Sequence, residues 1–374
     1  MLNIAALVSL SCIVAVWGLY PLVIGLMALV ARRREGRASL AAGATPHVTA
    51  VLATRADAAS VRERVDDLLR SDYPASRLDV VVAYDARAAD PIAAWSGDNA
   101  SRVRIVRGDE PGGKAAALNA GVRAARGEVL VFADSGQRFG ADAIALLAQA
   151  VLRPTIGAAS GRLELARGAT APALPLRLYW SLERWLRSRE ADVHSAVGVT
   201  GAIYAVRREL WTPLREGLIL DDLYVPMLLV LRGHRIAYSE AARAYETRAT
   251  TDGNEYRRKV RTLTGVLQLC AWLPHTLMPH RNPVWAQFVS HKLLRLLTPY
   301  WLLVCAVWAM TMIARQIGLA WLLAAVVLFA ALLQVRSRPF RALRSAVVSS
   351  ILVQVAAVRA TANGARGRWD VWHA

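Results

Sequence analysis

Long runs without a charged residue constrain this chain more than any other feature. Residues 4–30 carry no charged side chain over about 27 positions, and residues 296–314 and 316–335 form two further uncharged runs. A helix needs about 20 apolar residues to cross a bilayer. We therefore predict an N-terminal transmembrane helix over residues 1–31, and two spans within a C-terminal membrane region over residues 296–358.

A fourth apolar run is shorter. Residues 345–358 cover about 14 positions, too few for a span. We expect this segment to lie in the interface or to re-enter the membrane, with residues 359–374 as a basic tail on the cytoplasmic side. The alternative for the N-terminus is a cleaved signal peptide. We disfavour it because the first run is too long, no basic segment precedes it and no small-residue cleavage site follows it.

Basic residues beside the apolar runs set the expected orientation. Four of them follow the first run: Arg32, Arg33, Arg34 and Arg37. Basic flanks stay in the cytoplasm, so the first helix should run from outside to inside. Four more follow the run at 316–335 and place that end in the cytoplasm too, which agrees with one outward and one returning span: Arg336, Arg338, Arg341 and Arg344. We predict a multi-pass protein of the plasma (inner) membrane whose middle domain is cytoplasmic.

The overall charge is strongly positive. The formal net charge is +18 and the sequence pI is about 10.8. Such a charge is compatible with nucleic-acid binding. The arginines cluster beside the apolar runs, however, so we expect membrane lipids with anionic headgroups as partners and no nucleic acid. Cys12, Cys270 and Cys305 lie in apolar contexts without metal-ligand spacing, and we interpret them as small hydrophobic residues.

The middle of the chain, residues 45–262, has the pattern of a soluble α/β domain. β-rich runs alternate with stretches of helical spacing, such as residues 60–69, for which Ser60 is the expected N-cap. This alternation implies a mostly parallel sheet with both faces covered. Ligands of such sheets bind beyond the carboxyl ends of the strands. Residues 263–295, which follow, we assign to an amphipathic interfacial segment.

The stretch GDEPGGK, residues 108–114, has nearly the spacing of a nucleotide-binding phosphate loop and lies between a strand and a helix. Three features argue against ATP. Ala115 stands where Mg²⁺ needs a hydroxyl, Asp109 and Glu110 place negative charge near the phosphates, and strand–helix units precede the loop. Two readings remain: a glycine turn with a solvated lysine, or a turn that brings Lys114 to a nucleotide diphosphate in another way.

Aspartates occupy the matching positions on neighbouring elements. Asp85 and Asp134 each follow a predicted strand, and Asp221 and Asp222 precede a predicted helix. Each has an ordinary explanation alone, since strand-end aspartates cap loops and acids are favourable at helix starts. Their order along the chain, with Gly-Gly-Lys between the first two, indicates a functional site.

With these residues the sequence resembles a membrane-anchored family 2 glycosyltransferase. The resemblance covers about residues 45–290 and implies an α/β fold of the GT-A (Rossmann-like) type: a nucleotide-sugar domain with a mostly parallel sheet, plus N- and C-terminal transmembrane helices. The matching segments are residues 51–55, 72–74, 80–85, 113–121, 125–134, 198–204, 207–208 and 220–222.

The resemblance implies a role for each acid and for the lysine. Asp85 would contact the nucleotide base or ribose, and Lys114 would lie near the diphosphate. Asp134 would be the first acid of the Asp-x-Asp motif and would face the diphosphate and its metal, Mg²⁺ or Mn²⁺. Asp222 would be the general base that takes the proton of the acceptor hydroxyl. Asp221 would orient the site or cap the helix.

The sequence departs from the family pattern at two places. Gly136 replaces the second acid of Asp-x-Asp, which weakens the metal site, although Mg²⁺ can bind one carboxylate together with phosphates and water. A basic cluster at residues 257–262 stands where processive synthases have Gln-x-x-Arg-Trp. Arg258 and Arg261 would then bind the pyrophosphate, and the alternative for this cluster is a membrane-surface contact.

These observations predict an inverting membrane glycosyltransferase. We expect a nucleotide-sugar donor, a UDP-sugar in particular, and a lipid-linked or growing surface saccharide as acceptor. The rival is a catalytically impaired relative, a membrane-bound binding subunit that kept the fold and lost the metal site, which Gly136 favours. A phosphate-loop ATPase is the third reading. Nucleotide preference and turnover distinguish the three.

Overall fold

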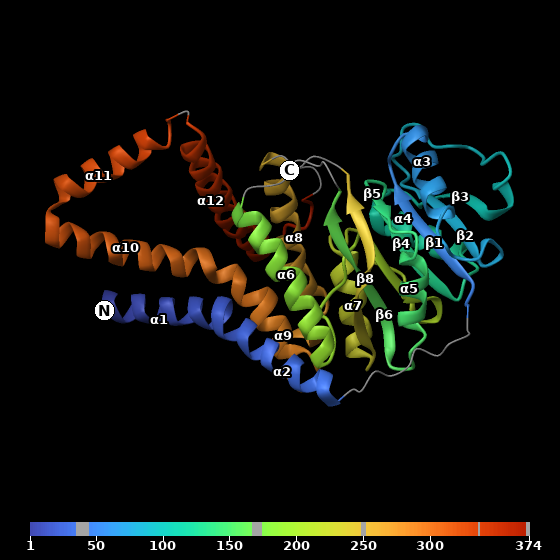
Figure 1. Ribbon diagram of the computed structural model, residues 1–374, viewed down its shortest axis with the longest axis horizontal. Coiled ribbons are helices and arrows are strands. Elements are labelled where there is room, and N and C mark those ends of the chain that lie inside the picture. Colours follow the sequence, from blue (N-terminus) through green and yellow to red (C-terminus); the bar gives the residue numbers. More distant parts are fainter. Residues whose placement is uncertain (35–44, 167–173, 248–251, 336, 372–374) are drawn as a thin grey trace.

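The computed structural model describes residues 1–34, 45–166, 174–247, 252–335 and 337–371, and it has two parts. An α/β domain contains the sheet, and a helical part extends away from it (Figure 1). Helices α6, α8 and α12 lie between the sheet and the outlying helices α1, α10 and α11. Residues 35–37 and Arg336, which belong to the basic flanks used above, lie outside the described residues.

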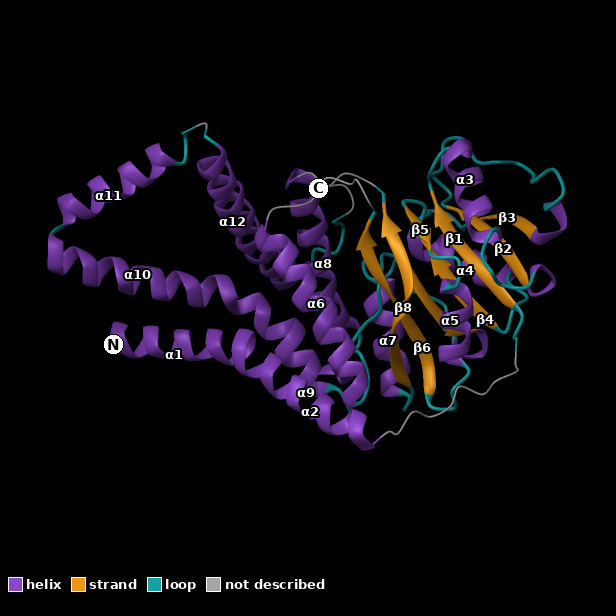
Figure 2. Cartoon of the chain, in the orientation of Figure 1, coloured by secondary structure: helices purple, strands orange, loops and turns teal. Residues whose placement is uncertain are grey.

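Eight strands form one mixed sheet in the order β3-β2-β1-β4-β7-β6-β8-β5 (Figure 2). β1 pairs in parallel with β2 and β4, β2 pairs in parallel with β3, and β6 pairs in parallel with β8. The pairs β4–β7, β6–β7 and β5–β8 are antiparallel. The strands are β1 Val48–Thr54, β2 Leu78–Tyr84, β3 Val103–Arg107, β4 Val129–Ala133, β5 Gln137–Phe139, β6 Ile156–Leu165, β7 Ile203–Arg207 and β8 Arg235–Glu246.

Helices cover both faces of the sheet because its strands are apolar on both sides. Side chains of β1 alternate between two cores: Leu52 packs in one with α3 (Ala58–Leu69) and α5 (Ala143–Val151), and Val51 packs in the other with α4 (Lys114–Ala124) and α7 (Asp221–Leu231). This arrangement confirms the predicted α/β class. It also leaves the carboxyl ends of β1, β2 and β4 at one edge of the sheet.

The predicted N-cap of α3 is wrong by three residues. Asp57 caps the helix, and its carboxylate accepts a hydrogen bond from the backbone amide of Ser60 at 3.0 Å. The helix begins at Ala58, so Ser60 lies within its first turn, where its hydroxyl donates to the same carboxylate at 2.8 Å. Aspartate and serine both cap helices well, and sequence position alone does not separate them.

A layer of three long helices separates the sheet from the outlying helices. These are α6 Leu174–Val193, α8 Asp252–Trp272 and α12 Arg338–Ala365. α12 packs along α8 and also contacts α6 and α10 (Thr298–Ile317). α8 is continuous across residue 262, where the sequence predicts the end of the soluble domain. The division of the chain into domains remains a prediction.

Within the part of the chain that the structure describes, three helices are long and apolar enough to cross a membrane: Leu2–Ala31, Trp285–Ile317 and Leu343–Ala365. The run at 316–335 forms only the 14-residue helix α11, Leu319–Leu332. The run at 345–358 was expected to be too short, but it lies inside the 28-residue α12. That expectation about length is wrong because α12 continues through polar residues on both sides of the apolar run.

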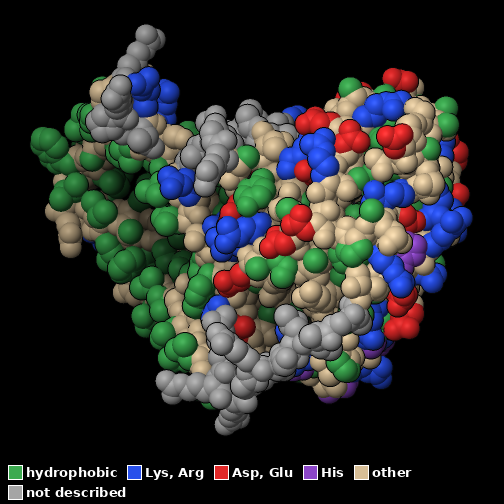
Figure 3. Space-filling view, turned by 45° about the vertical axis from the view of Figure 1, so that its right-hand side comes forward, with side chains coloured by type: hydrophobic (Ala, Val, Ile, Leu, Met, Phe, Trp, Pro, Cys, Tyr) green, Lys and Arg blue, Asp and Glu red, His purple; other side chains and the backbone are tan. Residues whose placement is uncertain are grey.

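Hydrophobic side chains gather on the outlying helices, and charged ones gather on the sheet domain (Figure 3). Leu7, Leu303, Trp321 and Val327, for example, are more than 60% exposed. Soluble proteins rarely expose apolar patches of this extent. The helical part therefore has the surface of a membrane-embedded structure, in agreement with the composition of its helices.

Candidate active site

Parallel pairing brings the predicted site residues to one edge of the sheet. Asp85 directly follows β2 and Asp134 directly follows β4, and both strands flank β1 in parallel. Lys114 is the first residue of α4, and Asp221 and Asp222 are the first two residues of α7. The carboxyl edge of the sheet thus joins residues that are up to 137 positions apart in the sequence.

Lys114 joins two of the acids. Its Nζ lies 3.1 Å from Oδ1 of Asp221 and 3.4 Å from Oδ1 of Asp134. Burial lowers the pKa of the lysine, but the charges of Asp134, Asp221 and Asp222 outweigh burial and raise the pKa above its usual value. The ammonium group is therefore charged at all physiological pH values. The turn GDEPGGK thus places its lysine among acidic side chains.

Asp221 is a partner of the lysine and not a helix cap. The N-cap of α7 is Leu220, and no side chain caps this helix end. The carboxylate of Asp221 is buried and accepts a hydrogen bond from the hydroxyl of Tyr204 at 3.3 Å. Of the two roles predicted for Asp221, capping is thus wrong. Its contacts suit the other role, orientation of the site.

Asp222 lies beside Asp221 but in different surroundings. A Cβ added to Gly201 would lie 3.0 Å from Oδ2 of Asp222, so the glycine makes room for this carboxylate. Burial and the neighbouring charge of Asp221 raise the pKa of Asp222, and the cations Lys114, Arg187 and Arg261 counteract that rise. A carboxylate with a raised pKa is a stronger base, which suits proton abstraction from a hydroxyl.

Asp85 has the opposite electrostatic environment. Its carboxylate accepts hydrogen bonds from Nε of Arg55 at 2.6 Å and from the amide of Arg87 at 3.0 Å. Burial raises the pKa of Asp85, but amide hydrogen bonds from Arg87 and Gly113 and the Arg55 contact together lower it to about 2. Gly112, at φ 89°, is needed here because an added Cβ would lie 2.5 Å from Oδ1 of Asp85.

The two predicted arginines of α8 differ in position. Arg261 is half-buried and close enough to affect the pKa of Asp222 by its charge. Arg258 is exposed, one helical turn earlier. The structure thus brings Arg261 to the acid cluster and leaves Arg258 at the surface of the helix.

Sequence reasoning missed Arg187 of α6. Its Nη1 donates to Oγ1 of Thr200 at 3.0 Å and its Nη2 lies 3.4 Å from Glu183. Glu183 is in turn bound by His291 at 2.8 Å and Arg295 at 3.2 Å. The Arg-rich composition of α6 was visible in the sequence, but nothing there indicated which arginine faces Asp222.

Arg64 fixes the turn after β4. The sequence did not identify this arginine either. Arg64 is completely buried, and its Nε donates to the carbonyl of Asp134 at 3.0 Å. Its guanidinium lies 4.3 Å from the ring centroid of Phe139, and burial lowers its pKa to about 10. This arginine therefore holds the backbone that presents Asp134.

The predicted metal site has fewer side-chain ligands than a site that holds a metal ion by protein groups alone. Among the described residues, no group of three or more His, Cys, Asp or Glu side chains is arranged to hold a metal ion. Gly136 offers only backbone, and its carbonyl accepts from the hydroxyl of Thr247 at 2.9 Å. The one acid of the motif, Asp134, still has a half-exposed carboxylate, which fits a Mg²⁺ or Mn²⁺ ion that also binds phosphates and water.

The fold and this acid-and-lysine site define an α/β enzyme of the nucleotide-sugar transferase class. A family model described as "Glycosyltransferase like family 2" matches residues 46–265. The chain belongs to this family and is a glycosyltransferase, as its resemblance to the family predicts. A search of curated protein sequences found no significant match.

One solved structure shares the fold over nearly the whole chain. A mannosyltransferase, PcManGT from Pyrobaculum calidifontis, in complex with GDP-Man and Mn²⁺, is 20% identical, with 97% of this chain and 99% of that chain covered and a TM-score of 0.68. TarS from S. aureus is 16% identical, with 65% of this chain and 43% of that chain covered and a TM-score of 0.42. The first likeness extends over the helical part as well as the sheet.

Proposed function

We propose that this chain is an inverting membrane glycosyltransferase that moves a sugar from a nucleotide diphosphate sugar to a lipid-linked or surface saccharide. The observation that carries the proposal is the contact of Lys114 with Asp134 and Asp221 directly beside Asp222. One cation and one carboxylate of raised pKa thus lie together, an arrangement that suits a single displacement at a sugar carbon.

Each residue of the site has a separate role in the proposed transfer. Asp222 accepts the proton of the acceptor hydroxyl as its oxygen attacks C1 of the donor sugar. The bond from C1 to the diphosphate breaks in the same step, and the charge that develops on the leaving group is stabilised by Lys114 and Arg261. Arg258 contributes if the bound diphosphate extends along α8. Asp85 holds the nucleoside end of the donor through its fixed negative charge.

A divalent ion fits this site through Asp134. When bound, Mg²⁺ or Mn²⁺ neutralises charge on the leaving diphosphate. Because Gly136 supplies no carboxylate, we expect a lower metal affinity than a site with both acids would have. Gly136→Asp should tighten the dependence of activity on Mg²⁺ or Mn²⁺ without abolishing turnover, as measured by metal titration of the initial rate.

A single experiment can identify the sugar donor. Purified chain in lipid nanodiscs should release UDP from one UDP-sugar in a panel that also contains GDP-mannose and ATP. Turnover with GDP-mannose alone would replace UDP by GDP, a possibility that the mannosyltransferase structure bound to GDP-Man supports. UDP binding without release of product would favour the impaired binding subunit.

We also propose that the sheet domain faces the cytoplasm, where nucleotide sugars are made. Support comes from Arg32, Arg33 and Arg34 at the end of the first span. A cysteine at the exposed position Ser96, in a chain without Cys12, Cys270 and Cys305, should resist an impermeant thiol reagent in intact cells. Labelling from outside would contradict both the orientation and the donor class.

A further inference from the structure

The loop that leads into the two acids of α7 is held by two side-chain amides. Residues 211–220 lie between the short 3-10 turn Arg208–Leu210 and α7, which begins with Asp221 and Asp222. Asn119 of α4 and Gln268 of α8 each form a clamp, that is, two hydrogen bonds from one side chain to the backbone of this loop. The function proposed above gives neither residue a role.

Gln268 is completely buried and clamps the end of the loop that is nearest to the acids. Its Nε2 donates to the carbonyl of Gly217 at 2.9 Å, and its Oε1 accepts from the amide of Ile219 at 2.9 Å. A side-chain amide both donates and accepts, so it can satisfy loop backbone as another backbone segment would. Because Ile219 is three residues before Asp222, this clamp fixes the backbone that leads directly into the base.

Asn119 clamps the same loop from a different helix. Its Nδ2 donates to the carbonyl of Leu214 at 2.9 Å, and its Oδ1 accepts from the amide of Leu214 at 2.8 Å. The helix that carries it, α4, begins with Lys114 five residues earlier. One helix thus holds both the loop and the lysine that contacts Asp134 and Asp221.

α8 likewise combines a clamp with a cation of the site. Arg261 and Gln268 are seven residues apart, which is about two helical turns, so they lie on one face of the helix. Gly265 lies between them, and a Cβ added there would collide with the side chain of Leu220. This face of α8 therefore packs directly against the loop at the residue that precedes Asp221.

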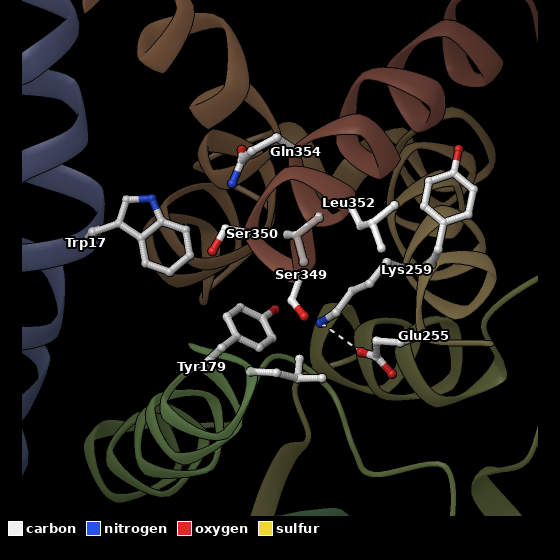
Figure 4. Close-up of a pocket in the computed structure, with 11 residues that line it drawn as sticks. Trp17, Tyr179, Glu255, Lys259, Ser349, Ser350, Leu352 and Gln354 are labelled. Carbon is white, nitrogen blue, oxygen red and sulfur yellow. Dashed lines mark ion pairs between the residues drawn. The ribbon is translucent and has the colours of Figure 1, made fainter. Parts of the chain in front are cut away.

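The opposite face of α8 is directed away from the loop. Lys259 lies nine residues before Gln268, about two and a half turns, and it lines a cavity of about 160 Å³. Trp17, Tyr179 and Ser349 line the same cavity from other helical segments (Figure 4). The two hydrogen bonds of Gln268 thus belong to the one face of α8 that meets the active site.

α8 is itself held in place by α12. Nδ2 of Asn363 donates to Oγ1 of Thr264 at 3.3 Å, and Thr264 is completely buried. A Cβ added to Gly364 would lie 3.0 Å from Cβ of Leu267, so the two helices approach closely. A group held by a packed helix is positioned more precisely than a group held by a loop alone.

We infer that Asn119 and Gln268 are positioning residues for the transfer, which hold the 211–220 loop so that the base Asp222 keeps its place relative to the two cations of the site. These cations, Lys114 and Arg261, come from the same two helices as the amides. The inference rests on the proposed function, because it takes Asp222 as the base. Each amide acts through the backbone of the loop and not on the reacting atoms.

Two variants test the clamps in the full chain in lipid nanodiscs. Gln268→Met and Asn119→Leu remove both hydrogen bonds of a clamp and keep a side chain of similar volume. Each should lower kcat, measured as UDP release from the UDP-sugar that the donor panel identifies, by about 10- to 100-fold, because a displacement of about 1 Å can cost that much. The Kd for UDP should stay within about twofold by calorimetry, since α4 and α8 keep their cations. The parent kcat in Gln268→Met would overturn the inference.

Asn282→Leu is the matched control. Asn282 is buried and clamps a different loop: its Nδ2 donates to the carbonyl of Thr276 at 2.7 Å, and its Oδ1 accepts from the amide of Val284 at 3.0 Å. The control should lower the melting temperature about as much as Gln268→Met, with kcat within about twofold of the parent. An equal fall in kcat would attribute the effect to lost stability and would contradict the inference.

A double variant separates positioning from general damage. If Gln268 acts through Asp222, Gln268→Met should change the residual rate of Asp222→Asn by less than about twofold. A further fall of about tenfold would show an effect that is independent of the base and would refute the positioning role.

The inference and the proposed function fail in different ways. Parent turnover in Asp222→Asn would remove the proposed base, and the positioning role with it. A slow Asp222→Asn together with an unchanged Gln268→Met would leave the proposed function standing and remove only the positioning role.

Discussion

Asp85 and Asp222 lie at the same edge of the sheet, yet their surroundings push their pKa values in opposite directions. Asp85 is bound by Arg55 and by backbone amides, which bring its pKa down to about 2. Asp222 is packed next to a second carboxylate, and burial and Asp221 raise its pKa. The lowered pKa suits a permanent anion that holds a ligand, and the raised pKa suits the proposed role of Asp222 as a base.

The difference between them arises from their neighbours and not from their residue type. Three cations near Asp222, namely Lys114, Arg187 and Arg261, counteract the rise in its pKa. Without them, burial and the charge of Asp221 would raise the pKa of Asp222 further. The comparison therefore predicts separable effects on binding and on catalysis.

The largest expected effect is on the base. Asp222→Asn should lower the rate by roughly 100-fold or more while leaving the affinity for UDP unchanged, because the proton acceptor is lost and the donor contacts are not. Steady-state rates and calorimetry measure the two quantities. Asp221→Asn should be milder, and the reverse ranking would show that the two acids have exchanged roles.

Lys114→Ala should weaken UDP binding by roughly 10- to 100-fold. The reason is the loss of a charge-assisted contact to the diphosphate, worth about 1.5–3 kcal/mol. ATP binding should stay negligible in both proteins. If calorimetry gave the variant the UDP affinity of the parent, GDEPGGK would be a simple turn, and the lysine would serve only to hold Asp134 and Asp221.

Asp85→Asn should raise the donor Kd by about tenfold, with kcat at saturating donor within about twofold. One hydrogen-bonded anion is lost from the donor site, and the base is untouched. Titration of the rate with donor separates the two terms. A fall in kcat comparable to that of Asp222→Asn would remove the distinction between the two aspartates.

The smallest effect concerns pH. Asp222 accepts a proton only when ionised, so kcat/KM should fall as pH drops through its raised pKa, whereas Asp85 stays charged down to a pH of about 2. Arg187→Met removes a cation that lowers the pKa of Asp222. The acid limb should therefore move to higher pH.

Arg189→Met is the matched control for this shift. Arg189 lies on the same helix but pairs with Asp192 at 3.2 Å and Glu240 at 3.4 Å. Its profile should coincide with that of the parent chain. An unchanged acid limb in Arg187→Met would show that this arginine only holds Glu183 and Thr200 in place and does not affect the pKa of Asp222.

Part of this site was predictable because local sequence encodes it. Apolar runs that end in Asp85 and Asp134 identify strand ends, and the glycines before Lys114 identify a turn into a helix. Arg187 and Arg64 were not predictable. Their roles depend on which face of α6 and α3 meets the sheet edge, and an arginine on an amphipathic helix looks the same whether it is solvated or buried.

The sequence by itself determined the alternation of strands and helices, the apolar helices, and the acids and lysine of the site, because these follow from hydrophobic period and residue chemistry over short distances. Tertiary structure alone decided that Lys114 joins Asp134 to Asp221, that the pKa of Asp85 is lowered while that of Asp222 is raised, and that Lys259 lies in a cavity beside the outlying apolar helices. A pKa and an ion pair depend on burial and on charges from distant segments, which only the folded chain brings together.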